Sequence, residues 1–232
     1  MRYILGIDIG TTAIKGAVIG EDGKIYGTKT SEYPLTTLPT GEVEADLQLY
    51  INAFTQSIKG AVEDAKVDVA DIKCVGFSST AETCVFLDKY NEPLCKVIAW
   101  MDTRATKEAE YLTAHFDKKD IINKVGFDGI YAIHPVSKIL AVKNKNPEIF
   151  EKTRMFAQIK DYFIYRLTGE YYTDHSTASD HGFFDITNRC YWNEMLEFTG
   201  IKEEYLPKLV EPGTELGTIS REAALELSLI HI

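Results

Sequence analysis

The chain has 232 residues, of which 45% are hydrophobic and 11% aromatic, so apolar burial can drive folding and a disordered chain is excluded. Its formal net charge of −10 argues against a nucleic-acid partner, because such binding requires a concentrated basic surface. No apolar run reaches the roughly 20 residues of a membrane helix, and the N-terminus enters a strand pattern without a signal segment, so we expect a cytoplasmic protein with no membrane partner.

The first part of the chain predicts a strand meander followed by a helix. Two β-branched apolar runs, residues 3–9 and 13–19, flank a short polar turn, and the alternation within each run indicates a β-hairpin. Residues 25–33 have the pattern of a third strand. A polar loop over residues 34–41 then leads into a long amphipathic helix that begins near Asp46. We therefore expect three antiparallel strands and a covering helix at the start of the fold.

The remainder alternates strand and helix patterns. Strands are predicted at residues 72–78, 84–87, 94–100 and 155–157. Helices are predicted at residues 104–116, 120–125, 135–144, 160–167, 193–198 and 221–227. This order predicts the α/β class, with a mixed sheet and flanking helices. The positive residues between Lys138 and Lys145 alternate with apolar positions at helical spacing, which favours a solvated helix face.

The turn of the first hairpin carries the strongest candidate site. An acid at a strand end, a glycine, two hydroxyls and a cation follow one another as Asp8, Gly10, Thr11, Thr12 and Lys15. Gly10 lets the backbone approach a ligand, the two threonines offer O–H and N–H donors, and Asp8 can hold a hydrated Mg²⁺. The pattern predicts a site for a metal-bound polyphosphate with Lys15 as compensating charge. The alternative is an ordinary hairpin with a polar turn.

Other phosphate-binding patterns are absent from the sequence. The chain has no G-x-x-x-x-G-K-[ST] run, and no G-x-G-x-x-G that opens a helix, because the residues after the turn return directly to strand character. The histidines show no ligand spacing such as H-x-x-x-H, so we expect lone surface or helix-end roles for them rather than a metal site. These other phosphate-binding patterns therefore do not fit the sequence.

Four stretches of the chain resemble motifs of the FGGY carbohydrate kinases, the family that contains xylulokinase, gluconokinase and glycerol kinase. The resemblance covers about residues 3–220, the N-terminal half of such a kinase. It implies a ribonuclease H-like, actin-like ATPase domain that binds a sugar or polyol, with ATP held between this domain and a second one. The stretches are G-I-D-I-G-T-T at 6–12, G-F-S-S-T-A-E-T at 76–83, A-W-M-D-T-R at 99–104, and D-Y, T-G, T-D and S-T-A-S within 161–179.

For the nucleotide, the resemblance assigns roles to the hairpin turn. Asp8 matches the acid that holds Mg²⁺ through water in the family. Thr11, Thr12 and Lys15 match positions that contact nucleotide phosphates, and Gly10 lies between them and the acid. The implied cofactors are ATP and Mg²⁺.

For the acceptor, the resemblance points to Ala81, Glu82, Trp100, Asp102 and Arg104. Glu82 stands where xylulokinase-like members carry a His and glycerol-kinase-like members a Glu that binds substrate hydroxyls. Ala81 stands where glycerol kinases place an Arg, so the specificity is left open between them. A carboxylate at this turn can accept hydrogen bonds from two neighbouring hydroxyls, and Trp100 can stack on a carbon skeleton. The alternatives are a surface acid, a core tryptophan and a surface ion pair worth under about 1 kcal/mol.

The implied reaction is transfer of the γ-phosphoryl group of ATP to a hydroxyl of a sugar or polyol. The family's proton-accepting Asp is expected beyond Ile232, after the helix that begins near Arg221, so no catalytic residue is assigned within the chain and it is expected to be inactive alone. We expect residues 1–227 to be a truncated N-terminal domain without its C-terminal partner. Residues 228–232 look like a non-native tail, because the last helix runs into an apolar tip without a capping residue.

Two further expectations concern the whole protein. The full-length protein is a candidate homodimer. The main alternative to a kinase is a non-catalytic sugar-binding or regulatory member of the actin-like ATPase superfamily. A regulator of the repressor type would be expected to carry a helix-turn-helix and a basic face, and neither is present in the sequence.

Overall fold

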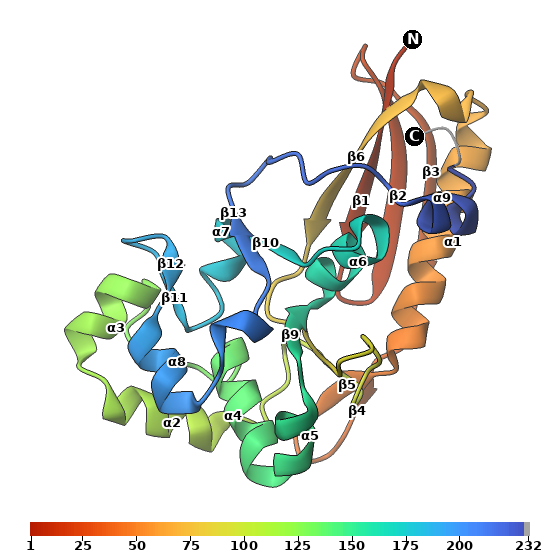
Figure 1. The fold of residues 1–232 in the computed structure, drawn as a ribbon. Coiled ribbons are helices and arrows are strands. Elements are labelled where there is room, and N and C mark those ends of the chain that lie inside the picture. The colour runs from red at the N-terminus through yellow and green to blue at the C-terminus, as the bar shows by residue number, and fades with distance from the viewer. Residues whose placement is uncertain (230–232) are drawn as a thin grey trace.

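The computed structural model describes residues 1–229, with a layer of sheet and helices at one end and a mainly helical part at the other (Figure 1). The main sheet has the strand order β3-β2-β1-β6. β1 pairs antiparallel with β2 and parallel with β6, and β3 pairs antiparallel with β2, which confirms the predicted meander and mixed sheet. The strands are β1 (Tyr3–Ile9), β2 (Ala13–Gly20), β3 (Ile25–Glu32) and β6 (Ile72–Ser79).

Helix α1 (Leu47–Ala65) lies across one face of this sheet. The helix approaches the sheet closely because β2 carries a glycine beneath it: a Cβ at Gly16 would lie 2.5 Å from the carbonyl oxygen of Ser57. The hydroxyl of Ser57 donates a hydrogen bond of 2.7 Å to the carbonyl oxygen of Ile14. Direct backbone contact therefore fixes the height of α1 above the hairpin.

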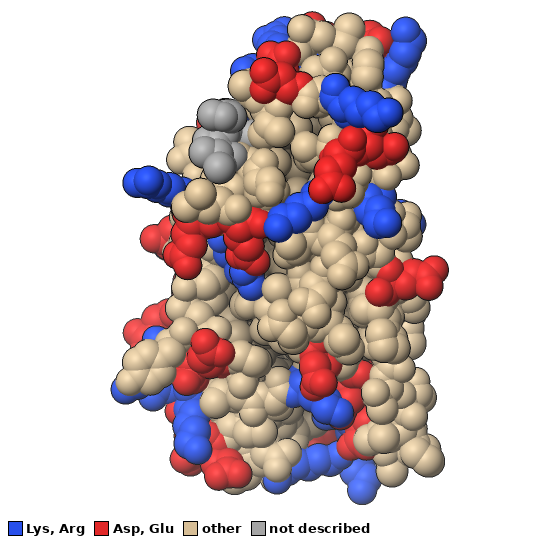
Figure 2. Space-filling view, turned by 90° about the vertical axis from the view of Figure 1, so that its right-hand side faces the viewer, with Lys and Arg blue, Asp and Glu red and all other residues tan. Residues whose placement is uncertain are grey.

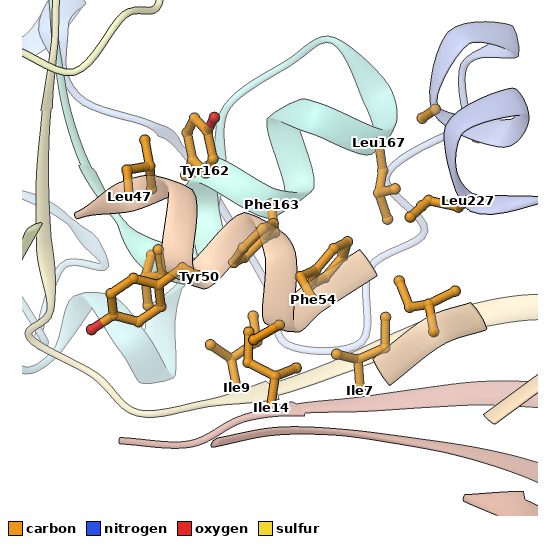
Figure 3. Close-up of a cluster of buried hydrophobic side chains, with 14 of the residues drawn as sticks. Ile7, Ile9, Ile14, Leu47, Tyr50, Phe54, Tyr162, Phe163, Leu167 and Leu227 are labelled. Atoms are coloured by element: carbon orange, nitrogen blue, oxygen red, sulfur yellow. The ribbon is translucent and has the colours of Figure 1, made fainter. Parts of the chain in front are cut away.

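The main core lies between the sheet and three helices. Figure 3 shows Ile7, Ile9 and Ile14 of the hairpin beneath α1, with side chains of α6 (Ile159–Thr168) and α9 (Arg221–Leu227) beside it. The rings of Phe54 and Phe163 stack with centroids 4.0 Å apart. Because strand side chains alternate between faces, the burial of Ile7 and Ile9 directs Asp8 to the opposite face, at the end of β1.

A second sheet connects the two parts of the molecule. Its strand order is β4-β5-β8-β7-β9, and its neighbouring strands are antiparallel. The strands are β4 (Thr36–Thr37), β5 (Val43–Ala45), β7 (Cys84–Leu87), β8 (Val97–Ile98) and β9 (Met155–Gln158). Every residue of β7 is buried, since one face meets the main core and the other the helical part.

The helical part encloses a second core that includes Phe86, Ile139 and Trp192. Its helices are α2 (Thr106–His115), α3 (Lys118–Val125), α4 (Pro135–Lys145), α5 (Pro147–Lys152) and α8 (Asn193–Thr199). The shorter elements are η1 (Val69–Asp71), β10 (Tyr172–Asp174), α7 (His175–Ala178), β11 (Phe184–Asp185), β12 (Cys190–Tyr191), η2 (Glu203–Tyr205) and β13 (Lys208–Val210). β10 pairs parallel with β13, and β11 pairs antiparallel with β12.

Three predictions about local structure are wrong. The strand expected over residues 94–100 is reduced to Val97–Ile98, because the chain turns at Ala99, whose carbonyl accepts the N–H of Asp102 at 3.1 Å. The predicted solvated face of α4 fails at Lys138, which is fully buried because loops from the second sheet cover it. His181, expected at the surface or at a helix end, is buried.

The predicted uncapped end of the last helix is also wrong. Ser228 takes the left-handed conformation, and the N–H of Leu229 donates to the carbonyl oxygen of Ala224 at 2.7 Å, a common way to satisfy the last carbonyls of a helix. The side chain of Leu229 is buried in the main core. That residues 228–232 are foreign to the protein stays a prediction, and residues 230–232 lie outside the described part of the chain.

The surface agrees with the acidic composition. On the face that Figure 2 shows, basic side chains are interspersed with acidic ones and form no continuous basic patch. Among the helices of residues 1–229, none has the length and apolar character to cross a membrane. Neither observation identifies a partner.

Candidate functional site

The β1–β2 turn presents its polar groups to solvent. Asp8 and Lys15 are cross-strand neighbours, with Lys15 Nζ 3.3 Å from Asp8 Oδ2, and both side chains are about half exposed. Gly10 is required here, because a Cβ at this position would lie 2.9 Å from the carbonyl oxygen of Ala13. Thr12 is exposed at the tip. The predicted group of acid, hydroxyls and cation therefore lies together, and an exposed ion pair of this kind is weak enough to open for a ligand.

The donor set of this turn suits a hydrated divalent cation rather than a cation held by protein alone. Residues 1–229 contain no group of three or more His, Cys, Asp or Glu side chains placed to hold a metal ion. Mg²⁺ commonly keeps several waters and takes one or two carboxylates together with phosphate oxygens. The single carboxylate of Asp8 fits that mode of binding, in which the nucleotide completes the coordination.

Glu82 lies in the turn between β6 and β7, next to half-buried Ala81. The turn is joined to the hairpin, because the N–H of Thr80 donates to the carbonyl oxygen of Ile9 at 2.9 Å. Glu82 has a positive φ of 66°, and its N–H donates to Oε1 of Gln158 at 2.7 Å. Its side chain therefore projects from a backbone that is held in an unusual conformation.

The environment of Glu82 changes its protonation. Burial raises the pKa of its carboxyl to about 7, with a smaller contribution in the same direction from the negative charge of Asp180 and an opposing one from Lys138. Near neutral pH this carboxyl is thus a mixture of protonated and ionised forms. It can donate as well as accept a hydrogen bond with a hydroxyl group, which suits a polyol ligand.

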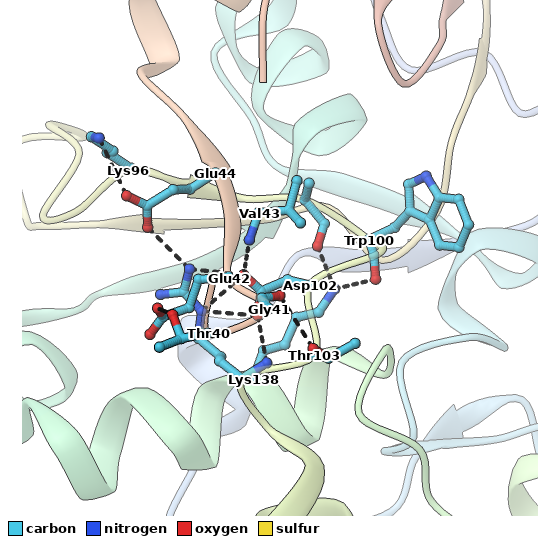
Figure 4. Close-up of polar contacts among 12 residues, drawn as sticks. Thr40, Gly41, Glu42, Val43, Glu44, Lys96, Trp100, Asp102, Thr103 and Lys138 are labelled. Carbon is cyan, nitrogen blue, oxygen red and sulfur yellow. Dashed lines mark hydrogen bonds and ion pairs between the residues drawn. The ribbon is translucent and has the colours of Figure 1, made fainter. Parts of the chain in front are cut away.

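Trp100 connects this region to the hairpin turn. Its indole Nε1 donates to Oγ1 of Thr11 at 3.0 Å, although the two residues lie 89 positions apart. In Figure 4 the indole ring points away from the polar cluster formed by its neighbours. The predicted phosphate turn and one predicted acceptor residue therefore share a contact. The tryptophan is half-buried, so its ring keeps an accessible surface.

Asp102 and Arg104 form a buried ion-pair network (Figure 4). The Asp102 carboxylate is fully buried and accepts hydrogen bonds from the N–H of Val43 at 2.6 Å and from Arg104 Nη2 at 2.8 Å. Arg104 Nη2 also lies 3.0 Å from Oε2 of Glu44. The alternative of a surface ion pair is therefore wrong. Both side chains are engaged with the protein and hold the loop after β8, and their direct contact with an acceptor stays a prediction.

Sequence reasoning missed Lys138 and Gln158. Lys138 donates from the helix α4 to backbone carbonyls of the Glu82 and Trp100 loops, and Gln158 accepts the N–H of Glu82. The signal for Lys138 was the apolar segment Ile139 to Val142 that follows it directly, since so apolar a stretch indicates that this part of the helix is buried. Gln158 gives no comparable signal, because Glu82, whose N–H its side chain accepts, lies 76 positions away in the sequence.

Two histidines are buried among residues 1–229, and neither can serve as a cationic group near neutral pH. Burial lowers the pKa of His134 to about 4 and that of His181 to about 3. His134 precedes α4, and its Nδ1 accepts the N–H of Tyr131 at 3.2 Å. Both are therefore neutral near neutral pH.

Comparison with solved structures gives the class of fold. The crystal structure of gluconate kinase from Lactobacillus acidophilus matches with a TM-score of 0.90 and 29% identity, over 98% of this chain and 45% of that one. The described fold is thus the ribonuclease H-like, actin-like ATPase fold that the resemblance implied, which confirms the predicted fold class.

Comparison of sequences gives the family. The profile of the FGGY family of carbohydrate kinases, N-terminal domain, matches residues 3–230, and this chain belongs to that family. It is 29% identical to the xylulose kinase of Bacillus subtilis (strain 168) over 233 residues, all of this chain and 46% of that protein. It is 30% identical to the glycerol kinase of Thermococcus gammatolerans (strain DSM 15229 / JCM 11827 / EJ3) over 227 residues, 95% of this chain and 45% of that protein. The chain thus spans about half the length of these relatives.

Proposed function

We propose that this chain is the acceptor-binding half of a kinase that transfers the γ-phosphoryl group of ATP to a hydroxyl of a sugar or polyol. The hydrogen bond between Trp100 Nε1 and Thr11 Oγ1 carries the proposal. An acceptor hydroxyl and the phosphoryl group must approach to about 3–3.5 Å before transfer. A direct bond between the proposed phosphate turn and a proposed acceptor residue supports a role for both in one reaction.

On the nucleotide side, Asp8 would hold Mg²⁺, and Gly10, Thr11, Thr12 and Lys15 would contact the phosphates. The cation would neutralise the charge that the phosphate oxygens carry during transfer. The exposed, Gly-containing turn supports this assignment, because the Thr12 side chain is exposed and the half-exposed ion pair of Lys15 with Asp8 is weak enough to open toward an anion.

On the acceptor side, Glu82 binds hydroxyl groups and Trp100 covers the carbon skeleton. We assign an uncharged acceptor, a ketose or a polyol rather than an aldonate. In the described part of the chain, Lys138 is engaged with backbone carbonyls and Arg104 with two carboxylates, and Lys15 is assigned to the nucleotide phosphates. The carboxylate of an aldonate would meet the acid of Glu82 without a free cation beside it.

In the transfer, the acceptor oxygen attacks the γ-phosphorus, the bond from that phosphorus to the bridging oxygen of ADP breaks, and the acceptor proton passes to a base. A general base contributes about 10²- to 10⁴-fold. We place this base in the rest of the protein, as an Asp beyond Ile232, and take residues 1–227 as the N-terminal domain. The length of the relatives, about twice that of this chain, supports this division. The 232-residue chain alone is then expected to bind an acceptor without turning it over.

The test is an ADP-release assay with ATP, Mg²⁺ and a panel of ketoses, polyols and aldonates, run on this chain and on one extended through the second domain. Asp8→Asn in the extended chain should abolish Mg²⁺-dependent turnover. The matched control is Asp22→Asn, which changes another exposed acid of the same meander. Equal turnover by Asp8→Asn and the control, or no turnover with any sugar or polyol, contradicts the function, and preference for an aldonate contradicts the uncharged acceptor.

A further inference from the structure

Lys138 joins two loops that are far apart in the sequence. It is the fourth residue of α4, and its side chain is fully buried. Its Nζ donates to the carbonyl oxygens of Glu82 at 2.7 Å and Ala99 at 2.9 Å. It also donates to the carbonyl oxygen of Trp100 at 3.0 Å (Figure 4). An ammonium group has three N–H donors, so all three are used on backbone oxygens of the loops after β6 and β8.

Burying a lysine side chain is energetically unfavourable compared with burying an apolar side chain of similar size. Burial lowers the pKa of Lys138, because removal of water disfavours the charged form. A methionine of similar length would fill the same volume without that penalty, but it has no donor for the three carbonyls. The ammonium contacts both loops at once, which indicates that joining them is its function.

The backbone of Glu82 is held from both sides. Gln158 accepts its N–H, Lys138 donates to its carbonyl, and the residue keeps the left-handed φ of 66° between these two contacts. The hydrogen bonds within residues 1–229 include none to the Glu82 carboxylate. Trp100 is held in a similar way, by Lys138 at its carbonyl and by Thr11 at its indole N–H. Both residues are thus fixed through the backbone, while the carboxylate and the indole face remain open to a ligand.

We propose that Lys138 is the positioning residue of the acceptor site: one ammonium sets the separation of Glu82 and Trp100 so that both contact the same sugar or polyol. This inference rests on the proposed function, in which Glu82 and Trp100 bind the acceptor. Lys138 itself does not touch the acceptor, because its donors are already occupied. It acts by preventing the two loops from moving independently, which is the usual requirement for a precise binding site.

The test uses fluorescence of the 232-residue chain. The chain has two tryptophans, and Trp192→Phe, a conservative change in the second core, leaves Trp100 as the single reporter. Lys138→Met removes the three donors at similar volume. Lys143→Met is the matched control, because Lys143 lies on the same helix and donates to the carbonyl of Thr199 at 2.7 Å, away from the two loops.

Both lysine variants should lower the midpoint of urea unfolding, but only Lys138→Met should shift the Trp100 emission and raise its acrylamide quenching about twofold or more. It should also weaken binding of xylulose, xylitol or glycerol about tenfold, measured through Trp100 quenching. Lys138→Gln, which keeps an amide donor, replaces Lys138→Met if that variant does not fold, and should shift the emission in the same direction.

Two results separate this inference from the proposed function. If Lys138→Met and Lys143→Met leave the emission and quenching of Trp100 equally unchanged, Lys138 stabilises the fold without positioning the loops, and the inference is overturned. If no sugar or polyol quenches Trp100 fluorescence in the parent protein, the acceptor binding that the proposed function requires is contradicted. The emission measured without ligand still decides in that case whether Lys138 holds the Trp100 loop.

Discussion

The hydrogen bond between Trp100 and Thr11 should be measurable in the absence of any ligand. Thr11→Val deletes the acceptor hydroxyl and keeps the shape of the side chain. The bond is partly buried, and a neutral hydrogen bond of this kind contributes about 0.5–1.5 kcal/mol net to the free energy of unfolding. We expect Thr11→Val to lower that free energy by about 1 kcal/mol. Trp100→Phe should lower it further, because the smaller ring also loses apolar contacts.

A double-mutant cycle isolates the bond from these other losses. The Thr11→Val, Trp100→Phe double variant should be more stable than additivity predicts by about 1 kcal/mol. Urea unfolding followed by far-UV circular dichroism is the assay, since tryptophan fluorescence changes with the mutation itself, and the m values must agree across the cycle. Thr12→Val, at the exposed neighbouring residue, is the control and should show no coupling to Trp100. A coupling below about 0.3 kcal/mol for Thr11 would refute the bond as a stable feature in solution.

Two further predictions follow from burial at other positions. Because the folded state holds the Glu82 proton with a pKa of about 7, above its ordinary 4.5, stability is lost as the pH rises through this interval. Glu82→Gln should therefore raise the free energy of unfolding at about pH 8 by about 1 kcal/mol, a figure discounted for the partial exposure of the side chain. At about pH 5 it should change the free energy of unfolding little. The same difference from the parent protein at both pH values in urea unfolding would contradict this prediction. Gly16→Ala should lower the free energy of unfolding by about 1–3 kcal/mol, because its Cβ would lie 2.5 Å from the Ser57 carbonyl oxygen. Gly76→Ala is the control and should not lower it, because a Cβ there would have no neighbour within 4 Å. Equal melting temperatures of the two variants would argue against the close approach of α1.

The parts of the site that could be predicted from the sequence are those whose conformation depends on a local sequence pattern. The turn from Asp8 to Lys15 lies between two alternating strands, so its groups meet through the geometry of a single hairpin. Glu82 follows one strand pattern and Trp100 ends another, each within a recognisable motif. The alternation of β1 also assigns Asp8 to the face away from the core. In these cases the residues that decide the conformation are close neighbours in the chain.

The parts that could not be predicted depend on contacts between distant segments. Lysine is a residue type that is usually solvated on a helix. Lys138 is a buried donor because two loops of the second sheet pack over it. The ion pair of Asp102 and Arg104 is buried because β5 brings Glu44 and the N–H of Val43 to it. The strand expected over residues 94–100 is short for the same reason, since tertiary contacts of the Trp100 loop override local β propensity.

The left-handed backbone of Glu82 has a consequence for how this position tolerates substitution. A side chain with a Cβ costs about 1–2 kcal/mol in this region of φ and ψ relative to glycine. For folding alone, glycine would therefore be the better residue at position 82, and Glu82→Gly would relax the turn while it removed the carboxylate. Stability and binding make opposite demands on this one position. A selection for thermal resistance that ignored the acceptor would be expected to replace Glu82 early, and the loss would appear first as a change in ligand specificity rather than in the fold.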